Sequence, residues 1–243
     1  MWWGFADSLP TDSTDTQGMS QRRENVLLAS RMALSIYQLK SRFQVLLRPL
    51  VVVLARHGVT ANLVTVMACL LSVVLGLALY LLPLPRVWFA LIPLWMLLRM
   101  AFNAIDGMLA REHGQQSVLG AYLNELTDVL SDAALYLPFA CVRPFDPFWV
   151  GAVVLMAALS EMAGMLGGAV GGVRQYDGPM GKSDRAFVFG CLGLLVALGA
   201  QGNDLPARWA PVAWVLPLVA LLTAWSIHNR IQSGIQYVHE RRS

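Results

Sequence analysis

Acidic and amide side chains recur at helical spacing in the stretch NAIDGMLAREHGQQSVLGAYLNELTDVLSD. In its first half, Asn103 and Asp106 share a helical face, because residues three or four apart lie on the same side of a helix. In its second half, Asn124, Asp128 and Asp132 share a face in the same way. Carboxylate and amide oxygens are ligands that Mg²⁺ and Mn²⁺ prefer. The spacing therefore predicts a site for a divalent cation.

The two halves are predicted to form an antiparallel helical hairpin with its turn at residues 114–117. Asp106 and Asn124 each lie nine residues from position 115, and Asn103 and Asp128 lie twelve and thirteen residues from it. Since a helix rises about 1.5 Å per residue, equal offsets give equal depth. The expected ligands therefore meet about 14–20 Å from the turn.

The composition indicates a membrane protein. Of the 243 residues, 56% are hydrophobic and only 14% are charged, whereas an ordinary soluble domain has about 25% charged residues. The net charge of +3 is too small to suggest a nucleic-acid partner. The three cysteines form no CxxC pair, which argues against a zinc site or a disulfide framework.

The expected fold is an all-α integral membrane protein with six transmembrane helices. Apolar runs of roughly 20 residues have the length that a bilayer demands of a helix, and they lie near 63–82, 87–110, 118–141, 148–171, 185–200 and 211–233. The remaining divisions are a disordered polar tail at 1–21, a basic amphipathic helix on the membrane surface at 22–57, a transmembrane domain at 58–236 and a C-terminal tail at 237–243.

The distribution of basic residues predicts the orientation. With both termini on the inside, the inside segments hold fourteen Lys and Arg residues, against three in the outside loops, namely Arg86, Arg143 and Arg208. Cytoplasmic loops are enriched in Lys and Arg. Both termini, and the end of the bundle that carries the cation site, are therefore expected to be cytoplasmic.

Arg99 and Glu161 are charged residues that lie inside predicted spans but outside the hairpin motif. Arg99 is expected to face a polar interior or to pair with an acid, because an unpaired charge is costly in a membrane. Glu161 is interpreted as structural, although it could also compensate for missing charge at the cation site, as could Glu125.

The segment DGMLAR, followed by eight residues and GAYLNELTD, resembles the signature DxxDGxxAR–x8–GxxxDxxxD of the CDP-alcohol phosphotransferases. The matched positions are Asp106, Gly107, Ala110, Arg111, Gly120 and Asp128. Asn103 and Asn124 stand where the signature has its first and third aspartates. The resemblance covers about residues 40–235, and six spans with cytoplasmic termini are similar to the family's topology.

The resemblance implies an enzyme of phospholipid synthesis. It would transfer a substituted phosphate from a CDP-linked alcohol, such as CDP-diacylglycerol, to the hydroxyl of a small alcohol and release CMP. Mg²⁺ or Mn²⁺ would bridge the diphosphate, and Asp128 would be the general base. The expected metal ligands are Asp106, Asp128, Asn103, Asn124 and Asp132, and the expected CDP-binding residues are Gly107, Ala110, Arg111 and Gly120.

Several alternatives stay open at this point. The number of metal ions in the site, one or two, is undecided. It is also undecided whether Asp132 binds a metal itself or only supports a residue that does. Arg174, Lys182 and Arg185 could be topology signals or could hold the phosphate of a phosphorylated acceptor. The alternative function is a non-catalytic membrane scaffold or lipid-binding relative. A homodimer in a bacterial inner membrane, with its active site facing the cytoplasm, is also expected.

Overall fold

The computed structural model describes residues 42–170, 172–199 and 207–241. The predicted tail at 1–21 and most of the predicted surface helix lie outside these residues. The chain divides into two units, Met1–Pro49 and Leu50–Ser243. In the first unit, residues 42–49 are helical. The second unit contains all of the predicted spans and all of the predicted site residues.

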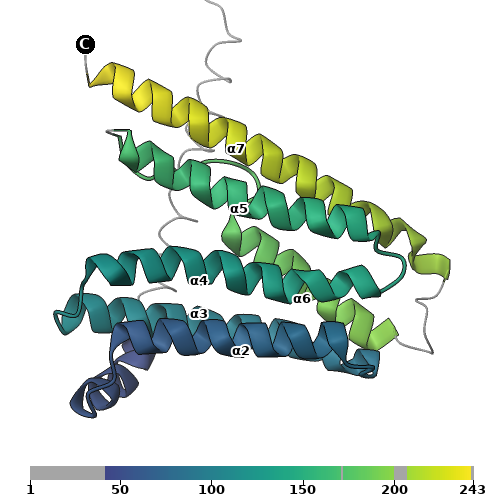
Figure 1. The fold of residues 1–243 in the computed structure, drawn as a ribbon, viewed down its shortest axis with the longest axis horizontal. Helices are drawn as coiled ribbons and strands as arrows, with labels where there is room; N and C mark the ends of the chain where they lie inside the picture. The colour runs from purple at the N-terminus through teal and green to yellow at the C-terminus, as the bar shows by residue number, and fades with distance from the viewer. Residues whose placement is uncertain (1–41, 171, 200–206, 242–243) are drawn as a thin grey trace, which may run out of the picture. The chain divides into compact units, whose positions relative to one another are not determined.

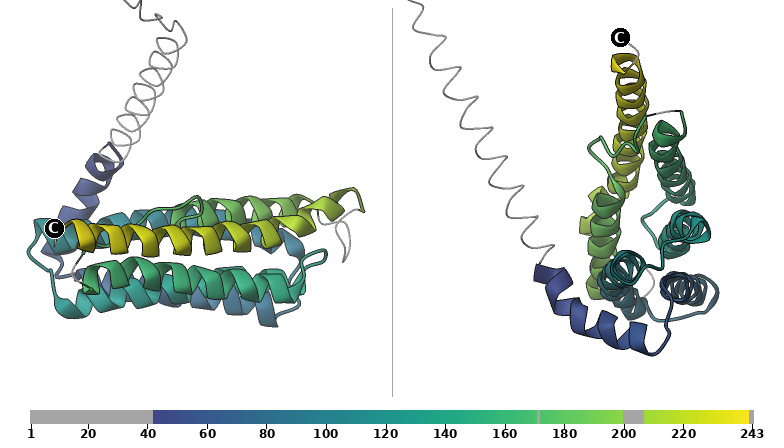
Figure 2. Two further views of the ribbon diagram at one scale, coloured as in Figure 1. Left: turned by 90° about the horizontal axis from the view of Figure 1, so that it is seen from above. Right: turned by 90° about the vertical axis from the view of Figure 1, so that its left-hand side faces the viewer.

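The second unit contains six helices of 18 to 26 residues that run roughly alongside one another (Figures 1 and 2). They are α2 (Ala61–Leu81), α3 (Leu91–Glu112), α4 (Val118–Tyr136), α5 (Pro147–Ala169), α6 (Lys182–Gly199) and α7 (Val215–Glu240). Short 3₁₀ helices, η1 (Arg86–Ala90), η2 (Leu137–Cys141) and η3 (Ala207–Trp214), adjoin α3, α4 and α7. Helix α2 packs on α3 and α4, α3 packs on α6, and α5 packs on α7. No β-strand occurs in the part of the chain that the structure describes.

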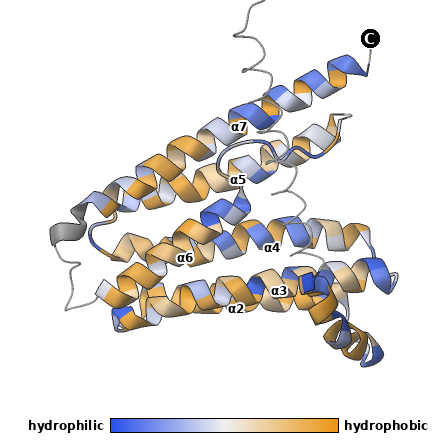
Figure 3. Cartoon of the chain, turned by 180° about the vertical axis from the view of Figure 1, so that it is seen from behind, coloured by the Kyte–Doolittle hydropathy of each residue, from blue (hydrophilic) through white to orange (hydrophobic). Residues whose placement is uncertain are grey.

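Among the residues that the structure describes, four helical segments are long and apolar enough to cross a membrane, namely Ala61–Leu81, Arg86–Glu112, Pro147–Ala169 and Pro211–Glu240. Figure 3 shows mainly apolar residues along α2 and α5. Helices α4 and α6 are of similar length but each carries three charged residues, which for α4 are Glu125, Asp128 and Asp132. The chain is thus an all-α integral membrane protein, while six spans and cytoplasmic termini stay predictions. Helix α7 ends at Glu240, seven residues beyond the predicted span.

The predicted hairpin at the centre of the sequence is present. Helix α3 ends at Glu112, and Gly114 adopts a positive φ of 66° in the turn, a conformation that glycine reaches without steric cost. Helix α4 begins after Ser117, whose hydroxyl accepts a hydrogen bond from the Gly120 backbone N–H at 2.9 Å. This side-chain cap satisfies a backbone donor that would otherwise be unpaired. Local sequence therefore sets the turn that places α3 and α4 side by side.

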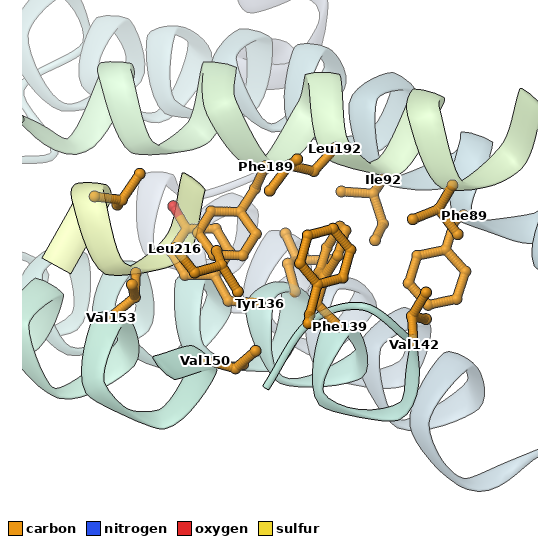
Figure 4. Packing of buried hydrophobic residues seen from close by; sticks show 14 of the residues in the cluster. Phe89, Ile92, Tyr136, Phe139, Val142, Val150, Val153, Phe189, Leu192 and Leu216 are labelled. Carbon is orange, nitrogen blue, oxygen red and sulfur yellow. The ribbon is translucent and has the colours of Figure 1, made fainter. Parts of the chain in front are cut away.

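An aromatic core holds the other end of α4 against α6 (Figure 4). The rings of Tyr136 and Phe189 stack with their centroids 3.7 Å apart. Phe139 packs edge-on against Phe189 at 5.2 Å and against Phe89 at 5.3 Å. All four side chains are buried. Because Tyr136 lies one helical turn beyond Asp132, this core fixes how the acidic face of α4 meets α6.

Helices α2 and α4 are in close backbone contact at Gly76. A Cβ atom added to Gly76 would overlap the backbone carbonyl oxygen of Ala134. Backbone atoms cannot rotate away as a side chain can, so this contact requires glycine. Small residues permit such close helix packing in membrane proteins.

We expect Gly76→Ala to destabilise the bundle by about 1–3 kcal/mol, the usual cost of overpacking. Gly151→Ala in α5 is the matched control, because nothing lies within 4 Å of a Cβ added there, and alanine should stabilise that helix by roughly 0.5–1 kcal/mol. Thermal unfolding of the detergent-solubilised protein measures both. Equal melting temperatures for the two variants would contradict the assigned α2–α4 contact.

Candidate active site

Asp106 lies on the buried face of α3, where it faces α2. Its side chain is 6% exposed, and its Oδ2 accepts a hydrogen bond from the Thr65 hydroxyl at 2.7 Å. Thr65 also donates to the Ala61 carbonyl, 3.0 Å away. Helix α2, which the sequence analysis did not connect with the site, therefore fixes the orientation of this carboxylate.

A pocket of about 570 Å³ opens beside Asp106 between α2, α3 and α4. The predicted ligands Asn103 and Asn124 line it together with Glu125. So do all the residues that the resemblance assigned to CDP binding, namely Gly107, Ala110, Arg111 and Gly120. The structure thus brings Asp106, Glu125, the two predicted amide ligands and the expected nucleotide contacts into one cavity.

The glycines of this pocket keep it open. A Cβ added to Gly120 would lie 2.8 Å from Asn62 Oδ1 and 3.0 Å from Ser117 Oγ. A Cβ added to Gly107 would lie 3.0 Å from the Arg111 guanidinium. Larger residues at these positions would displace the polar groups around the cavity. This agrees with the expectation that a ligand approaches the helix backbone here.

Asp128 and Asp132 do not line this pocket, and both form ion pairs with basic side chains. Arg99 donates to Asp128 Oδ1 at 3.0 Å and to Asp132 Oδ1 at 2.6 Å. The Lys182 ammonium group forms an ion pair with Asp128 Oδ2. Asn103 Nδ2 faces Asp128 Oδ1 at 3.5 Å. The prediction that Arg99 pairs with an acid is confirmed, and it pairs with two.

The five predicted metal ligands therefore divide into two groups. Of the acids Asp106, Glu125, Asp128 and Asp132, only Asp106 makes no ion pair within the part of the chain described. The same residues contain no cluster of three or more His, Cys, Asp or Glu side chains that could hold a metal ion by themselves. Asp106, with the amide oxygens of Asn103 and Asn124, supplies hard donors that suit one Mg²⁺ or Mn²⁺. The residues present fit a single divalent cation.

The three predicted acceptor-binding cations lie in the connector before α6 and in the first turn of α6, and two of them pair with acids of α4. Arg174 forms an ion pair with Glu125 and donates to Glu161 Oε2 at 3.3 Å. Burial lowers the pKa of Arg174, but the hydrogen bond and charge of Glu125 outweigh it, and the pKa is raised overall. Lys182 binds Asp128, as described above. Arg185 has no exposed surface and donates to Glu161 Oε1 at 2.9 Å.

Sequence reasoning missed Arg230. It was one of the fourteen basic residues counted on the inside, but it lies on the buried face of α7 with 3% of its surface exposed. It donates to the Ser160 carbonyl at 2.5 Å and lies 3.7 Å from Glu161 Oε1. Its position inside the predicted span 211–233 was the available signal, because a charge there needs a partner. Glu161 thus contacts three arginines and has the structural role expected of it.

A second cavity, of about 570 Å³, lies between α3 and α6. Its walls are mainly apolar and include Met96, Phe187 and Leu194. Five polar side chains also line it: Arg99, Asn103, Asp132, Lys182 and Ser183. Asn103 lines both cavities. The pocket beside Asp106, a polar chamber, and this second cavity, a mainly apolar groove, therefore meet at Asn103.

Known proteins share both the sequence and the fold. The chain is 44% identical over 200 residues to Inner membrane protein YnbA of Escherichia coli K12, covering 82% of this chain and 96% of that protein. Its fold matches Mycobacterium tuberculosis phosphatidylinositol phosphate synthase (PgsA1) with CDP-DAG bound, at a TM-score of 0.58 and 20% identity, over 76% of this chain and 92% of that one. The same synthase in complex with manganese and citrate matches with a TM-score of 0.59 at 19% identity, over 76% and 87%.

The family comparison agrees with the signature and with the pocket that its residues form. The sequence model described as CDP-alcohol phosphatidyltransferase matches residues 58–227, which run from just before α2 to the middle of α7. The chain belongs to the CDP-alcohol phosphatidyltransferase family.

Proposed function

We propose that the protein transfers a phosphatidyl group from CDP-diacylglycerol to the hydroxyl of a small phosphorylated alcohol and releases CMP. The observation that carries this proposal is the pocket beside Asp106, which gathers Gly107, Ala110, Arg111 and Gly120 around one unpaired carboxylate. The solved relative with CDP-DAG bound has the same fold. That relative is a phosphatidylinositol phosphate synthase, and a phosphorylated acceptor would likewise give a phosphorylated product here.

The two cavities suit the two parts of the donor. The cytidine and diphosphate are polar and would occupy the chamber beside Asp106, where Arg111 can pair with phosphate oxygens. The acyl chains would lie in the apolar groove between α3 and α6. Because Asn103 lines both cavities, the diphosphate–lipid junction would lie near this residue. The reacting phosphorus would then be close to Asp128.

Asp128 is the proposed general base. Arg99 and Asn103 face its Oδ1, so Oδ2, which contacts Lys182, is the oxygen that would take the proton from the acceptor hydroxyl. The attacking oxygen would form a bond to the phosphorus that bears the lipid, and the bond from that phosphorus to CMP would break. A bound divalent cation would neutralise charge on the diphosphate as CMP leaves.

Asp128→Asn should abolish CMP release while lipid-donor binding persists, because the base acts on the acceptor. The assay follows CMP release from CDP-diacylglycerol with Mn²⁺ or Mg²⁺ and a panel of alcohols. Asp146→Asn is the matched control: Asp146 caps α5 through Phe148 N at 2.8 Å, and asparagine caps equally well. If the unaltered protein releases no CMP with any acceptor, the scaffold or lipid-binding alternative replaces this proposal.

The acceptor site is proposed at Arg174 and Lys182, with Arg185 supporting it through Glu161. The side chains of Arg174 and Lys182 are 31% and 30% exposed, so they can contact a ligand, whereas Arg185 is fully buried. A phosphate monoester carries about −1.5 to −2 charge at neutral pH. Two accessible cations beside the base would favour such an acceptor over a neutral alcohol.

We expect Arg174→Ala to raise the KM for a phosphorylated acceptor roughly ten- to hundredfold, the loss of one charge-assisted hydrogen bond of about 1.5–3 kcal/mol. The KM for CDP-diacylglycerol should change little. Arg143→Ala, at the other end of the bundle, removes the same charge and serves as the control. Equal increases in both KM values, or full activity with an uncharged alcohol, would contradict a phosphate-binding role.

The location and assembly proposals follow from the sequence. The relative named as an inner membrane protein supports a multi-pass protein of the bacterial inner membrane. A cytoplasmic active site and a homodimer are further parts of this proposal. The cytoplasmic side is supported by the excess of Lys and Arg in the connectors beside the site.

A further inference from the structure

Asp128 and Asp132 form a charge-balanced group with Arg99 and Lys182. Arg99 binds one oxygen of each carboxylate, at 3.0 Å and 2.6 Å, and Lys182 binds the second oxygen of Asp128. Two negative charges therefore meet two fixed positive charges. A divalent cation that entered between them would face like charge from both basic side chains.

Asp106 has the opposite environment. Its carboxylate is 6% exposed and makes no ion pair in the described residues, and a buried carboxylate without a counter-charge is costly. Asn103 and Asn124 share its pocket and add oxygen donors without adding negative charge. Asn103 also presents its amide nitrogen to Asp128 at 3.5 Å, which leaves its carbonyl oxygen for the pocket. Asp106 is thus the acid of the hairpin site that no cation among the described residues pairs with directly.

We propose that the protein binds one divalent cation, at Asp106 with the amide oxygens of Asn103 and Asn124, and that the ammonium group of Lys182 excludes a second cation from Asp128. Lys182 and Arg99 serve as permanent counter-charges of Asp128, which acts as a base and not as a metal ligand. This inference rests on the proposed function, because the divalent cation is expected from that chemistry. It narrows the five predicted metal ligands to three.

Lys182 is the residue through which this proposal can be tested. Arg99 is buried, so its removal would leave two buried carboxylates without a partner and would endanger the fold. The Lys182 side chain is 30% exposed and lies in the first turn of α6. Replacing it uncovers Asp128 Oδ2 next to the existing cation pocket while Arg99 continues to hold Oδ1.

The experiment counts bound Mn²⁺ in the full-length, chelator-treated protein in detergent, without lipid or nucleotide, from the loss of the free Mn²⁺ signal in electron paramagnetic resonance. The unaltered protein should bind one Mn²⁺ per chain. Lys182→Met should bind a second, and Lys182→Arg should still bind one. Arg143→Met removes one charge far from the site and should also leave one.

A second variant tests the ligand set independently. Asn124→Asp adds a carboxylate to the pocket of Asp106 and should lower the Mn²⁺ dissociation constant at least about tenfold, equivalent to roughly 1.4 kcal/mol. The stoichiometry should remain one, because Lys182 is still present. Unchanged affinity in Asn124→Asp would remove residue 124 from the proposed ligands.

Three results would overturn the proposal: two Mn²⁺ per chain in the unaltered protein, none at all, or one in both the unaltered protein and Lys182→Met. If Lys182→Met does not fold, Lys182→Gln gives the same test with a polar side chain. Since the titration contains no substrate, its outcome is separate from CMP release. One Mn²⁺ with no CMP release refutes the proposed function alone, and CMP release with two Mn²⁺ refutes this inference alone.

Discussion

Glu161 of α5 contacts three arginines that come from α6, from α7 and from the connector before α6. Charges buried in an apolar bundle need partners, and this need determines how the second half of the chain meets the first. Arg174 continues the network to Glu125 of α4. Lys182, at the start of α6, pairs with Asp128, which also lies in α4. The ion pairs therefore join the acidic hairpin to the helices and connector that supply its cations.

This arrangement separates the site into regions with different chemistry. The chamber beside Asp106 combines one unpaired carboxylate with neutral amides and small residues, so it can accept a phosphate-bound cation and a nucleotide. The groove between α3 and α6 is apolar and can accept hydrocarbon. A donor with a polar head and lipid tails matches this division. Asn103 lines both regions and lies 3.5 Å from Asp128 Oδ1, so the proposed base is next to their junction.

The effect of Asn103 and Asn124 on the charge of the site depends on the cations around them. In the signature alone, Asn103 and Asn124 look like losses, because each removes a negative charge that could bind metal. In the structure, Arg99 and Lys182 provide positive charge at Asp128. The two asparagines remove negative charge relative to the signature, and Arg99 and Lys182 add positive charge, so both make the local charge more positive. Both effects reduce the negative charge that bound metal would have to neutralise. This is consistent with a site whose charge is balanced by one divalent ion.

The sequence by itself determined the hairpin, its turn at Gly114–Ser117, and the shared depth of Asp106 and Asn124, because helical spacing, capping and the left-handed turn are local properties. It also required a partner for Arg99, since an unpaired charge in a membrane is costly. It could not identify which acid that partner would be. The burial of Arg230 and the pairing of Lys182 with Asp128 were equally out of reach. Those contacts join helices far apart in the chain, and only the packing of α6 and α7 against α4 and α5 decided them.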